Sequence, residues 1–298
     1  MASKVWIDGG VRDASQARVP VFDRGFLYGD SVYEVLRTFG GRPFALDEHL
    51  DRLERSAERI GLVLPERSQI EKATRASIVA TREPECYLRI MVTRGAGPIG
   101  LDPALADAPR LVVMALPLVL PEERLYHDGV AVALVSARRN VAGAPGAVDP
   151  QVKSGNYLNS VVGVAEARRH RAYEALLCDG VGRLAEGSSS NLFLVRGGRL
   201  ATPPLSVGLL EGITRRHVIA LARRLGLAVD ELALWPVDLE HAEEAFLTSS
   251  VRGVMPIVRL STLQREEKII GPGRPGEITK RVGEAYLKAA EEMSRAAG

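Results

Sequence analysis

The sequence has 298 residues, of which 46% are hydrophobic and 26% charged, a balance typical of a folded globular protein rather than a disordered chain. Its 39 basic and 37 acidic residues give a formal net charge of +2, which argues against a surface for nucleic acid or anionic membrane. Two cysteines far apart in the sequence, Cys86 and Cys178, exclude a disulfide framework.

The composition also bounds the size and the location of the protein. No N-terminal apolar run has the length of a signal peptide, and no stretch approaches the ~20 apolar residues of a membrane span. The five histidines form no pair with metal-ligand spacing. We therefore expect a cytoplasmic protein of two domains without a metal site.

The first third of the chain predicts a mixed α/β layer. A helix is expected over Asp47–Ile60, because apolar residues recur at helical spacing, Asp47 can cap its start and Gly61 can end it. Stretches rich in β-branched and aromatic residues predict strands. These strands are Lys4–Asp8, Val32–Phe39, Tyr87–Thr93 and Leu111–Leu116.

The pattern of strands and helices is interrupted at Pro117 and Pro121, whose spacing suits an extended connector. We place the domain boundary here, with a small α/β domain over 1–118, a linker over 119–126 and a larger domain over 127–298. The expected strands of the second part are Val130–Ser136, Glu174–Cys178, Leu192–Val195, Ala245–Thr248 and Ile257–Leu260. Its expected helices are Tyr157–Arg169, Ile213–Leu225 and a last one from Gly276 to the end. The predicted class is α+β or α/β with two domains.

Lysine is scarce in this chain, and one lysine stands apart. The lysines are Lys4, Lys72, Lys153, Lys268, Lys280 and Lys288. Lys153 lies between a loop rich in Gly, Ala and Pro and an apolar helix. A lysine that projects from such a loop into a cleft loses solvent, which favours the neutral amine that attacks an aldehyde. An ordinary solvated loop lysine fits the same pattern.

A second feature is the segment 185–193, AEGSSSNLF, in which Glu186 precedes a Gly/Ser loop and an apolar strand. A carboxylate in this place can pair with a ring nitrogen and keep it protonated, as pyridoxal phosphate (PLP) requires when it acts as an electron sink. An exposed glutamate in a hairpin turn explains the same residues.

Two further features fit a phosphate group. The segment 209–215, LLEGITR, leads into the helix that begins at Ile213, where free backbone N–H groups and the Thr214 hydroxyl can bind an anion. Arg52 projects nearer to the apolar side of its helix than Arg55 or Arg59 does, and can donate to a phosphate. A simple helix cap and a surface arginine are the alternatives.

The order of these features along the chain carries more information than any of them alone. The motifs are FDRGFLYGDSVYEVLR (22–37), HLDRLERS (49–56), KSGNY (153–157), AEGSSSN (185–191) and EGITR (211–215). Together they resemble the class IV (fold type IV) PLP aminotransferases, from about Trp6 to about Pro256. That family includes branched-chain and D-amino-acid transaminases and aminodeoxychorismate lyase. The resemblance implies a small N-terminal α/β domain and a larger PLP-binding domain with a barrel-like β core.

The resemblance also implies a role for particular residues. Lys153 is expected to hold the cofactor as a Schiff base and to shuttle a proton between substrate Cα and cofactor C4′, while Glu186 holds the pyridine nitrogen. Tyr157 is expected to bond the phenolic oxygen, and Leu209 to pack against the ring. The implied phosphate-binding residues are Arg52, Ile213, Thr214 and Ser250, the last standing where some relatives have threonine.

Members of the family work as homodimers with shared active sites. Tyr28 and Leu101 match positions that reach the partner's site. The implied substrate-pocket residues are Tyr33, Tyr87, Arg89 and Val251, with backbone N–H groups of the turn 249–251 assisting the α-carboxylate.

The substrate is less constrained than the family. The Tyr-x-Arg strand at Tyr87 and Arg89 resembles the L-branched-chain group, and no Arg-x-His trap of the D-enzymes lies between Arg94 and Pro109. Residues 29–35 also resemble the D-enzymes. We expect transamination from an L-amino acid with an apolar side chain to 2-oxoglutarate, whose second carboxylate would meet Arg89, or else Arg37 or Arg94. The alternatives are a D-amino acid transaminase, aminodeoxychorismate lyase and an (R)-amine transaminase.

Overall fold

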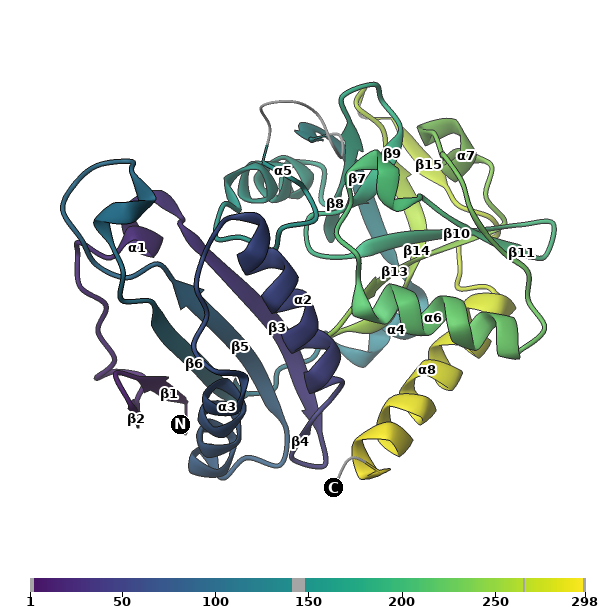
Figure 1. The fold of residues 1–298 in the computed structure, drawn as a ribbon. Helices are drawn as coiled ribbons and strands as arrows, with labels where there is room; N and C mark the ends of the chain where they lie inside the picture. The colour runs from purple at the N-terminus through teal and green to yellow at the C-terminus, as the bar shows by residue number, and fades with distance from the viewer. Residues whose placement is uncertain (1–2, 141–147, 265, 297–298) are drawn as a thin grey trace. The chain divides into compact units, whose positions relative to one another are not determined.

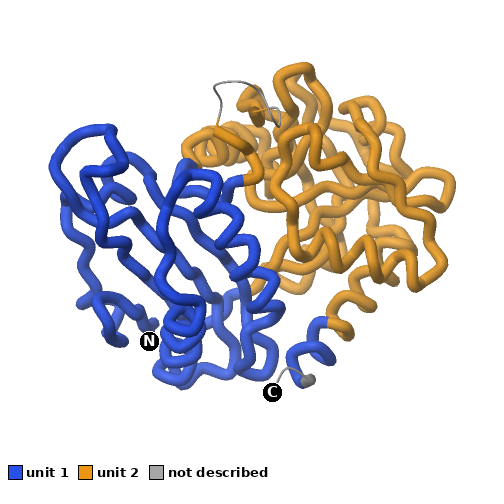
Figure 2. Tube along the Cα trace, viewed as in Figure 1, with its two compact units in different colours: residues 1–119, 152–156, 290–298 blue, residues 120–151, 157–289 orange. Residues whose placement is uncertain are grey.

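The computed structural model describes residues 3–140, 148–264 and 266–296 (Figure 1). These residues pack as two compact units, shown in blue and orange in Figure 2. The first unit comprises residues 1–119, 152–156 and 290–298, and the second comprises residues 120–151 and 157–289. The short segment 152–156, which carries Lys153, therefore packs with the N-terminal unit although it lies in the second half of the sequence.

The first unit is built on a six-stranded antiparallel sheet with the order β2-β1-β6-β5-β3-β4. Its strands are β1 (Lys4–Ile7), β2 (Gly10–Asp13), β3 (Ser31–Phe39), β4 (Arg42–Pro43), β5 (Cys86–Thr93) and β6 (Arg110–Pro117). Its helical segments are α1 (Arg24–Tyr28), α2 (Leu46–Arg59), α3 (Arg67–Thr81) and the 3-10 turn η1 (Pro103–Leu105). Helices α2 and α3 cover one face of the sheet and share its apolar core (Figure 1).

Strand β3 separates two kinds of environment because its side chains alternate between the faces of the sheet. Leu36 belongs to the core under the helices, and Glu34 points to the same side. On the other face, Val35 stands opposite Arg89 in the register of β3 and β5. Tyr33 shares that second face. The sheet therefore presents its Tyr and Arg side chains away from the helical layer.

Helix α2 confirms the predicted helix but not its predicted cap. The residue at the N-cap is Ala45, in a left-handed conformation and without a side-chain hydrogen bond, and Asp47 lies within the first turn. An acidic residue in the first turn interacts favourably with the positive end of the helix dipole, but it does not cap the helix. Arg52 is 5% exposed, so it is buried as the helical wheel predicted.

The second unit contains a closed barrel. Six strands form a ring in the order β7-β8-β9-β10-β13-β14, because β10 pairs with both β9 and β13 and β14 pairs with β7. Their bounds are β7 (Val130–Arg139), β8 (Glu174–Asp179), β9 (Leu184–Gly187), β10 (Asn191–Arg196), β13 (Glu244–Ser249) and β14 (Gly253–Ser261). The β9–β10 contact that closes the ring joins Glu186 to Asn191. The barrel-like core predicted for this region is confirmed.

Helices and short strands surround the barrel. The parallel pair β7 and β8 is connected through α5 (Leu158–Arg169), which packs on both strands as a parallel crossover requires. The other elements are α4 (Glu123–Asp128), β11 (Arg199–Thr202), η2 (Leu205–Val207), α6 (Ile213–Arg224), β12 (Val229–Glu231), α7 (Pro236–Glu240), β15 (Glu267–Ile269) and α8 (Glu277–Ala296). Phe193 and Phe246 stack at 4.9 Å across β10 and β13.

The alternative of an exposed turn at Glu186 does not hold, since Glu186 is 7% exposed and belongs to β9. Helix α4 begins at Glu123, within the segment expected to link the two domains. Within the described ranges, no helix combines the length and the apolar character that crossing a membrane requires.

Candidate active site

The backbone around Lys153 is held against the start of β3. The Tyr33 N–H donates to the Lys153 carbonyl at 3.0 Å, and the Gly155 N–H donates to the Ser31 carbonyl at 3.0 Å. On the other side, the Lys153 N–H donates to Ser56 Oγ of α2 at 3.2 Å. These bonds fix the backbone of a loop lysine, so its side chain starts from a defined place.

The turn before β3 allows this close approach because it contains Gly29. Gly29 has φ +68°, and a Cβ atom there would lie 2.5 Å from Asn156 Oδ1. Any other residue would be strained in this conformation and would collide with the lysine segment. The glycine of the GD dipeptide at residues 29–30 therefore serves the docking of residues 153–156.

The Tyr33 ring brings two cationic side chains together. Lys153 Nζ lies 4.7 Å from the ring centroid, and Arg89 Cζ lies 4.1 Å from it. Arg89 Nε is buried and has no hydrogen-bond partner among the described residues. Arg94, by contrast, donates to Asp30 at 2.7 Å and to two backbone carbonyls of the 60–61 turn. Arg94 is thus a structural residue, whereas Arg89 retains the capacity to bind a carboxylate.

Arg52 lies in a buried cluster with Glu34 and His49. Its Nε and Nη2 atoms donate to the two oxygens of Glu34 at 2.7 and 2.6 Å, in a bidentate pair. His49 Nδ1 lies 2.7 Å from Glu34 Oε2, and both side chains are fully buried. Burial raises the pKa of Glu34, but Arg52 and His49 outweigh it and hold the pKa at about 2. Burial lowers the pKa of His49, so the ring is neutral and its Nδ1 donates to the carboxylate.

Glu186 is surrounded by donors from three segments of the second unit. Arg139 Nε lies 2.9 Å from Oε1, while the Leu210 N–H (3.1 Å) and Asn191 Nδ2 (3.4 Å) donate to Oε2. The same Arg139 donates to the carbonyls of Gly208 at 3.3 Å and Pro150 at 2.8 Å. Sequence reasoning missed Arg139, since no motif distinguishes it from the neighbouring Arg138.

Helix α6 begins at Ile213, as the sequence predicted, and the first N–H groups of an α-helix have no partners within the helix. Its N-cap is Gly212, which provides no side-chain cap. A Cβ atom at Gly212 would lie 1.9 Å from Asn191 Oδ1, so the helix start is packed against β10. Ile213 and Thr214 are both buried, and Thr214 Oγ1 lies 3.3 Å from Tyr286 Oη.

The β13–β14 hairpin lies beside the same tyrosine. Ser249 pairs with Gly253 at its end, which leaves the loop Ser250–Arg252. Gly253 has φ +67°, and a Cβ atom there would lie 3.3 Å from the Tyr286 ring. Tyr286 therefore contacts both the helix start at Thr214 and the hairpin that carries Ser250. The structure thus groups three of the predicted phosphate-binding residues in the second unit.

The remaining predicted site residues occupy varied environments. Tyr157 is the N-cap of α5, and Leu209 is fully buried against Ala185 and Val207. In the first unit, Tyr28 Oη accepts a hydrogen bond from the Gly100 N–H at 3.2 Å. Leu101 is 80% exposed.

The predicted site residues divide between the two units. The group on the first unit is Tyr28, Tyr33, Arg52, Tyr87, Arg89, Leu101 and Lys153. The group on the second unit is Tyr157, Glu186, Leu209, Ile213, Thr214, Ser250 and Val251. Glu34, His49 and Arg139 join these groups through their contacts, although the sequence did not single them out.

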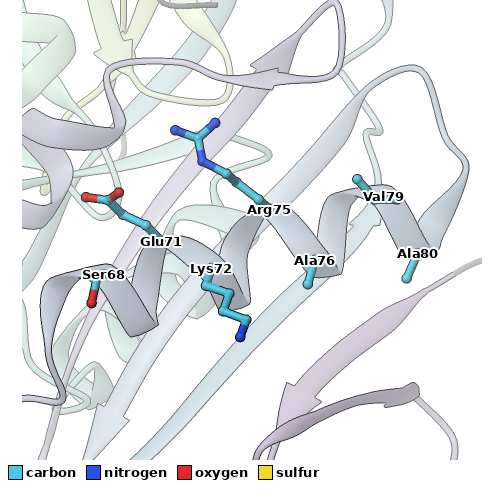
Figure 3. Close-up of a pocket in the computed structure, with 7 residues that line it drawn as sticks. All are labelled: Ser68, Glu71, Lys72, Arg75, Ala76, Val79 and Ala80. Carbon is cyan, nitrogen blue, oxygen red and sulfur yellow. The ribbon is translucent and has the colours of Figure 1, made fainter.

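A separate hollow lies on the outer side of α3 and contains none of these residues (Figure 3). Its lining is Ser68, Glu71, Lys72, Arg75, Ala76, Val79 and Ala80. All seven residues come from one helix, so the hollow is a shallow surface feature rather than a site assembled by the fold.

Residues 31–260 match the family described as amino-transferase class IV, which is most of the chain. The chain belongs to the class IV aminotransferases. A putative branched-chain-amino-acid aminotransferase of Methanocaldococcus jannaschii is 36% identical to it over 284 residues, covering 95% of each chain. A D-alanine aminotransferase of Bacillus licheniformis is 31% identical over 281 residues, covering 94% of each.

Solved structures support the family assignment and the fold type IV architecture of this aminotransferase. The Escherichia coli branched-chain amino acid aminotransferase has a TM-score of 0.88 and 29% identity, with 97% of this chain and 95% of that chain covered. A branched-chain amino acid aminotransferase of T.th., complexed with N-(5′-phosphopyridoxyl)-L-glutamate, has a TM-score of 0.87 and 30% identity, covering 97% and 94%.

Class IV aminotransferases use PLP and act on small amino and keto acids. The side chains of this aminotransferase fit that cofactor. Glu186 is a buried carboxylate suited to a ring nitrogen, and the uncapped start of α6 is suited to a phosphate. Lys153 supplies a primary amine beside the Tyr33 ring. Among the described residues, no cluster of His, Cys, Asp and Glu could hold a metal ion.

The pKa of Glu34 predicts an acid-sensitive stability. Because the folded pKa of about 2 lies below the ordinary value of 4.5, the stabilisation is present above pH 4.5 and is lost as pH falls toward 2. The shift corresponds to about 3 kcal/mol. In Glu34→Gln we expect a protein destabilised by about 3–5 kcal/mol at neutral pH, since Arg52 loses its partner.

Urea unfolding measured between pH 7 and pH 2.5 tests this expectation. The variant should lose stability less steeply with acid than the wild type does. Glu54→Gln is the control, because Glu54 is half exposed and only joins a surface ion pair with Arg67. Identical acid slopes in wild type and Glu34→Gln would contradict the assignment.

Proposed function

We propose that this aminotransferase moves an amino group from an L-amino acid with an apolar, branched side chain to 2-oxoglutarate, with PLP held by Lys153. The observation that carries the proposal is that Lys153 and Arg89 both lie beside the Tyr33 ring, and that Arg89 Nε is buried without a hydrogen-bond partner among the described residues. The relatives named as branched-chain aminotransferases support the donor, and the L-glutamate adduct of one of them supports the acceptor pair.

When bound, PLP supplies an electron sink that stabilises negative charge at substrate Cα. Lys153 would hold the cofactor through its amine, and the same amine would move the proton between substrate Cα and cofactor C4′. The hydrogen bonds on both sides of its backbone limit the arc through which Nζ moves. The Tyr33 ring lies beside that arc and excludes water from it.

The second unit supplies the anchors for the cofactor in this proposal. Glu186 holds the proton on the ring nitrogen, and Arg139 pairs with the Glu186 carboxylate at 2.9 Å and orients it. Ile213 and Thr214 bind the phosphate at the start of α6, with Ser250 from the hairpin. Leu209 packs on the ring, Tyr157 bonds its phenolic oxygen, and Arg52 adds a charge from the first unit.

Arg89 is the proposed partner of the substrate's carboxylate. It lies on the face of the sheet with Tyr33 and Tyr87, and its Nε has no protein partner among the described residues. A buried guanidinium nitrogen without a partner is costly, and a bound carboxylate would supply the missing bond. We assign the second carboxylate of 2-oxoglutarate to Arg89 and the α-carboxylate to the N–H groups of the 249–251 turn.

A D-amino acid transaminase is the second candidate. The D-alanine aminotransferase of Bacillus licheniformis covers as much of the chain as the branched-chain relatives do, at 31% identity. The L-assignment is favoured because the segment from Arg94 to Pro109 contains no histidine, so the Arg-x-His trap is missing.

A homodimer completes the proposal, with the two units acting as its small and large domains. The segments 22–27 and 97–101 are joined by the hydrogen bond from the Gly97 N–H to the Phe22 carbonyl, and they expose a group of large apolar side chains. These are Phe22 (53%), Phe26 (72%), Ile99 (75%) and Leu101 (80%). Contiguous apolar side chains on a surface mark an interaction site. We propose that a second copy covers them and receives Tyr28 and Leu101 at its own site.

Visible absorption of the purified holoenzyme tests the reaction. The band of the lysine-bound cofactor should give way to the pyridoxamine form on addition of L-leucine, and Lys153→Ala should lack both the lysine-bound band and turnover. D-alanine should leave the spectrum unchanged. A response to D-alanine alone would overturn the donor assignment, and a chain that stays colourless with added PLP would overturn the function.

The role of Arg89 predicts a selective loss. Arg89→Leu should raise KM for 2-oxoglutarate about 10–100-fold, because one charged hydrogen-bonded contact is worth about 1.5–3 kcal/mol. The KM for an aliphatic keto acid should change much less, in a steady-state assay with each acceptor. Arg75→Leu, on the outer face of α3, is the matched control (Figure 3). Equal losses for both acceptors would assign Arg89 to the α-carboxylate instead.

The dimer is tested by sedimentation equilibrium of the wild type. The expected mass is twice the 32.2 kDa of the chain. Phe26→Asp should shift the protein toward the monomer, because a carboxylate cannot be buried there without a partner. Val79→Asp is the control, since Val79 is 77% exposed on α3. A wild type that sediments as a monomer at micromolar concentration would refute the dimer.

A further inference from the structure

The loop between β13 and β14 carries an arginine to which the proposed chemistry gives no role. Register pairing of β13 and β14 ends at Ser249 and Gly253, and a three-residue loop remains between them. The left-handed φ of +67° at Gly253 is typical of such loops. Arg252 is the last residue of this loop, directly after Ser250 and Val251.

The Arg252 side chain folds back over three segments instead of extending into solvent. Nη1 donates to Glu174 Oε2 at 2.8 Å, Nη2 donates to Ser189 Oγ at 2.9 Å, and Nε donates to Ser249 Oγ at 3.1 Å. The side chain is only 16% exposed. Its backbone carbonyl also accepts a hydrogen bond from Tyr126 Oη at 3.0 Å. These bonds form a clamp that ties the loop to the body of the unit.

Glu174 forms the fixed end of this clamp. It lies on β8 with its side chain 4% exposed, and its carboxylate accepts from Arg252 and from the Ser188 hydroxyl. The Ser189 and Ser190 hydroxyls approach it at 3.4 and 3.5 Å. The serine loop 188–190 leads from β9, which carries Glu186, to β10. The clamp therefore joins the hairpin loop to the loop that follows Glu186.

The neighbours of Arg252 stabilise its charged form. Burial opposes that form, but the Glu174 carboxylate and Tyr173 together outweigh burial and raise the pKa of the guanidinium. A buried ion pair of this kind adds little net stability compared with an apolar pair of the same size. The pair instead contributes orientation. Hydrogen bonds on three sides of the planar guanidinium fix the Arg252 side chain and thereby the backbone that carries it.

We propose that Arg252, held by Glu174, is a positioning residue that orients the 250–252 loop to bind an anionic oxygen group, the phosphate of the cofactor or the α-carboxylate of the substrate. This inference rests on the proposed function, in which Ser250 binds the phosphate and the turn assists the carboxylate. Tyr286 links the loop to the start of α6. Asn191 lies beside the start of α6 and donates to Glu186, and the clamp joins the loop to the segment that follows Glu186. Loss of the clamp leaves the covalent chemistry of Lys153 intact and loosens one anion contact.

The test uses the variant pair Arg252→Met and Glu174→Gln, alone and combined. The combined variant removes both charges, so it leaves no buried unpaired ion and keeps the fold measurable by thermal unfolding. Arg259→Met is the matched control, because Arg259 lies on the same strand, β14, and its ion pair with Glu267 is exposed. The binding readout is tryptophan fluorescence of the apoprotein, titrated with PLP and separately with pyridoxal, which lacks the phosphate.

The ratio of the two dissociation constants separates the outcomes. If the loop binds the phosphate, the preference for PLP over pyridoxal falls about tenfold or more in the combined variant and stays unchanged in Arg259→Met. If it binds the carboxylate, the preference is kept and KM for L-leucine rises by a similar factor. If neither quantity moves relative to the control, the inference is wrong. A wild type that shows no preference for PLP would instead refute the proposed function.

Discussion

A carboxylate in a protein interior must have a cation and hydrogen-bond donors beside it, or its burial costs several kcal/mol. Within the part of the chain that the structure describes, three glutamates are buried, and each one pairs with an arginine. The pairs are Glu34 with Arg52, Glu186 with Arg139, and Glu174 with Arg252. Because a guanidinium has more donors than one carboxylate can use, each arginine of the second unit also bonds other parts of the chain. The site is organised by these additional bonds.

Arg139 shows how one pair constrains distant segments. Its hydrogen bonds to the carbonyls of Pro150 and Gly208 hold two separate loops next to the arginine that pairs with Glu186. Pro150 precedes Lys153 by three residues, and Gly208 directly precedes Leu209. The arginine that pairs with Glu186 therefore also holds the two loops that lead to Lys153 and Leu209. A shift of one of these loops would have to break a charged hydrogen bond.

The sequence allowed the family, the barrel-like core and most of the long elements to be predicted, because motif order and strand composition are local properties. Helical spacing could place Arg52 nearer to the apolar side of its helix than Arg55 or Arg59, but it left a surface position open, and only the structure shows that Arg52 is buried. The acid–arginine pairs could not be predicted. Arg139 and Glu186 are 47 positions apart in sequence, and the pairing of both β7 and β9 with β8 brings them together.

The strand through Glu186 was missed for a related reason. Its residues, LAEG, lack the β-branched and aromatic side chains that mark strands, and a Gly/Ser run follows. The pairing with β8 and β10 imposes the extended conformation. Local strand propensity cannot identify a strand whose extended conformation is imposed by pairing with neighbouring strands.

The use of lysine or arginine at a position depends on whether the side chain there must keep its charge or lose it. Only six of the 39 basic residues are lysines, and one of these is Lys153. Arginine keeps its charge in every environment a protein offers, so it suits positions that must hold an anion continuously. The residue that attacks an aldehyde and carries a proton must lose its charge, which only lysine can do. Arg89 stands between these roles, because it is permanently charged but its buried Nε has no protein partner among the described residues. In the function we propose, a bound carboxylate would supply the missing hydrogen bond, so the cost of burying this atom would favour the bound state over the empty one.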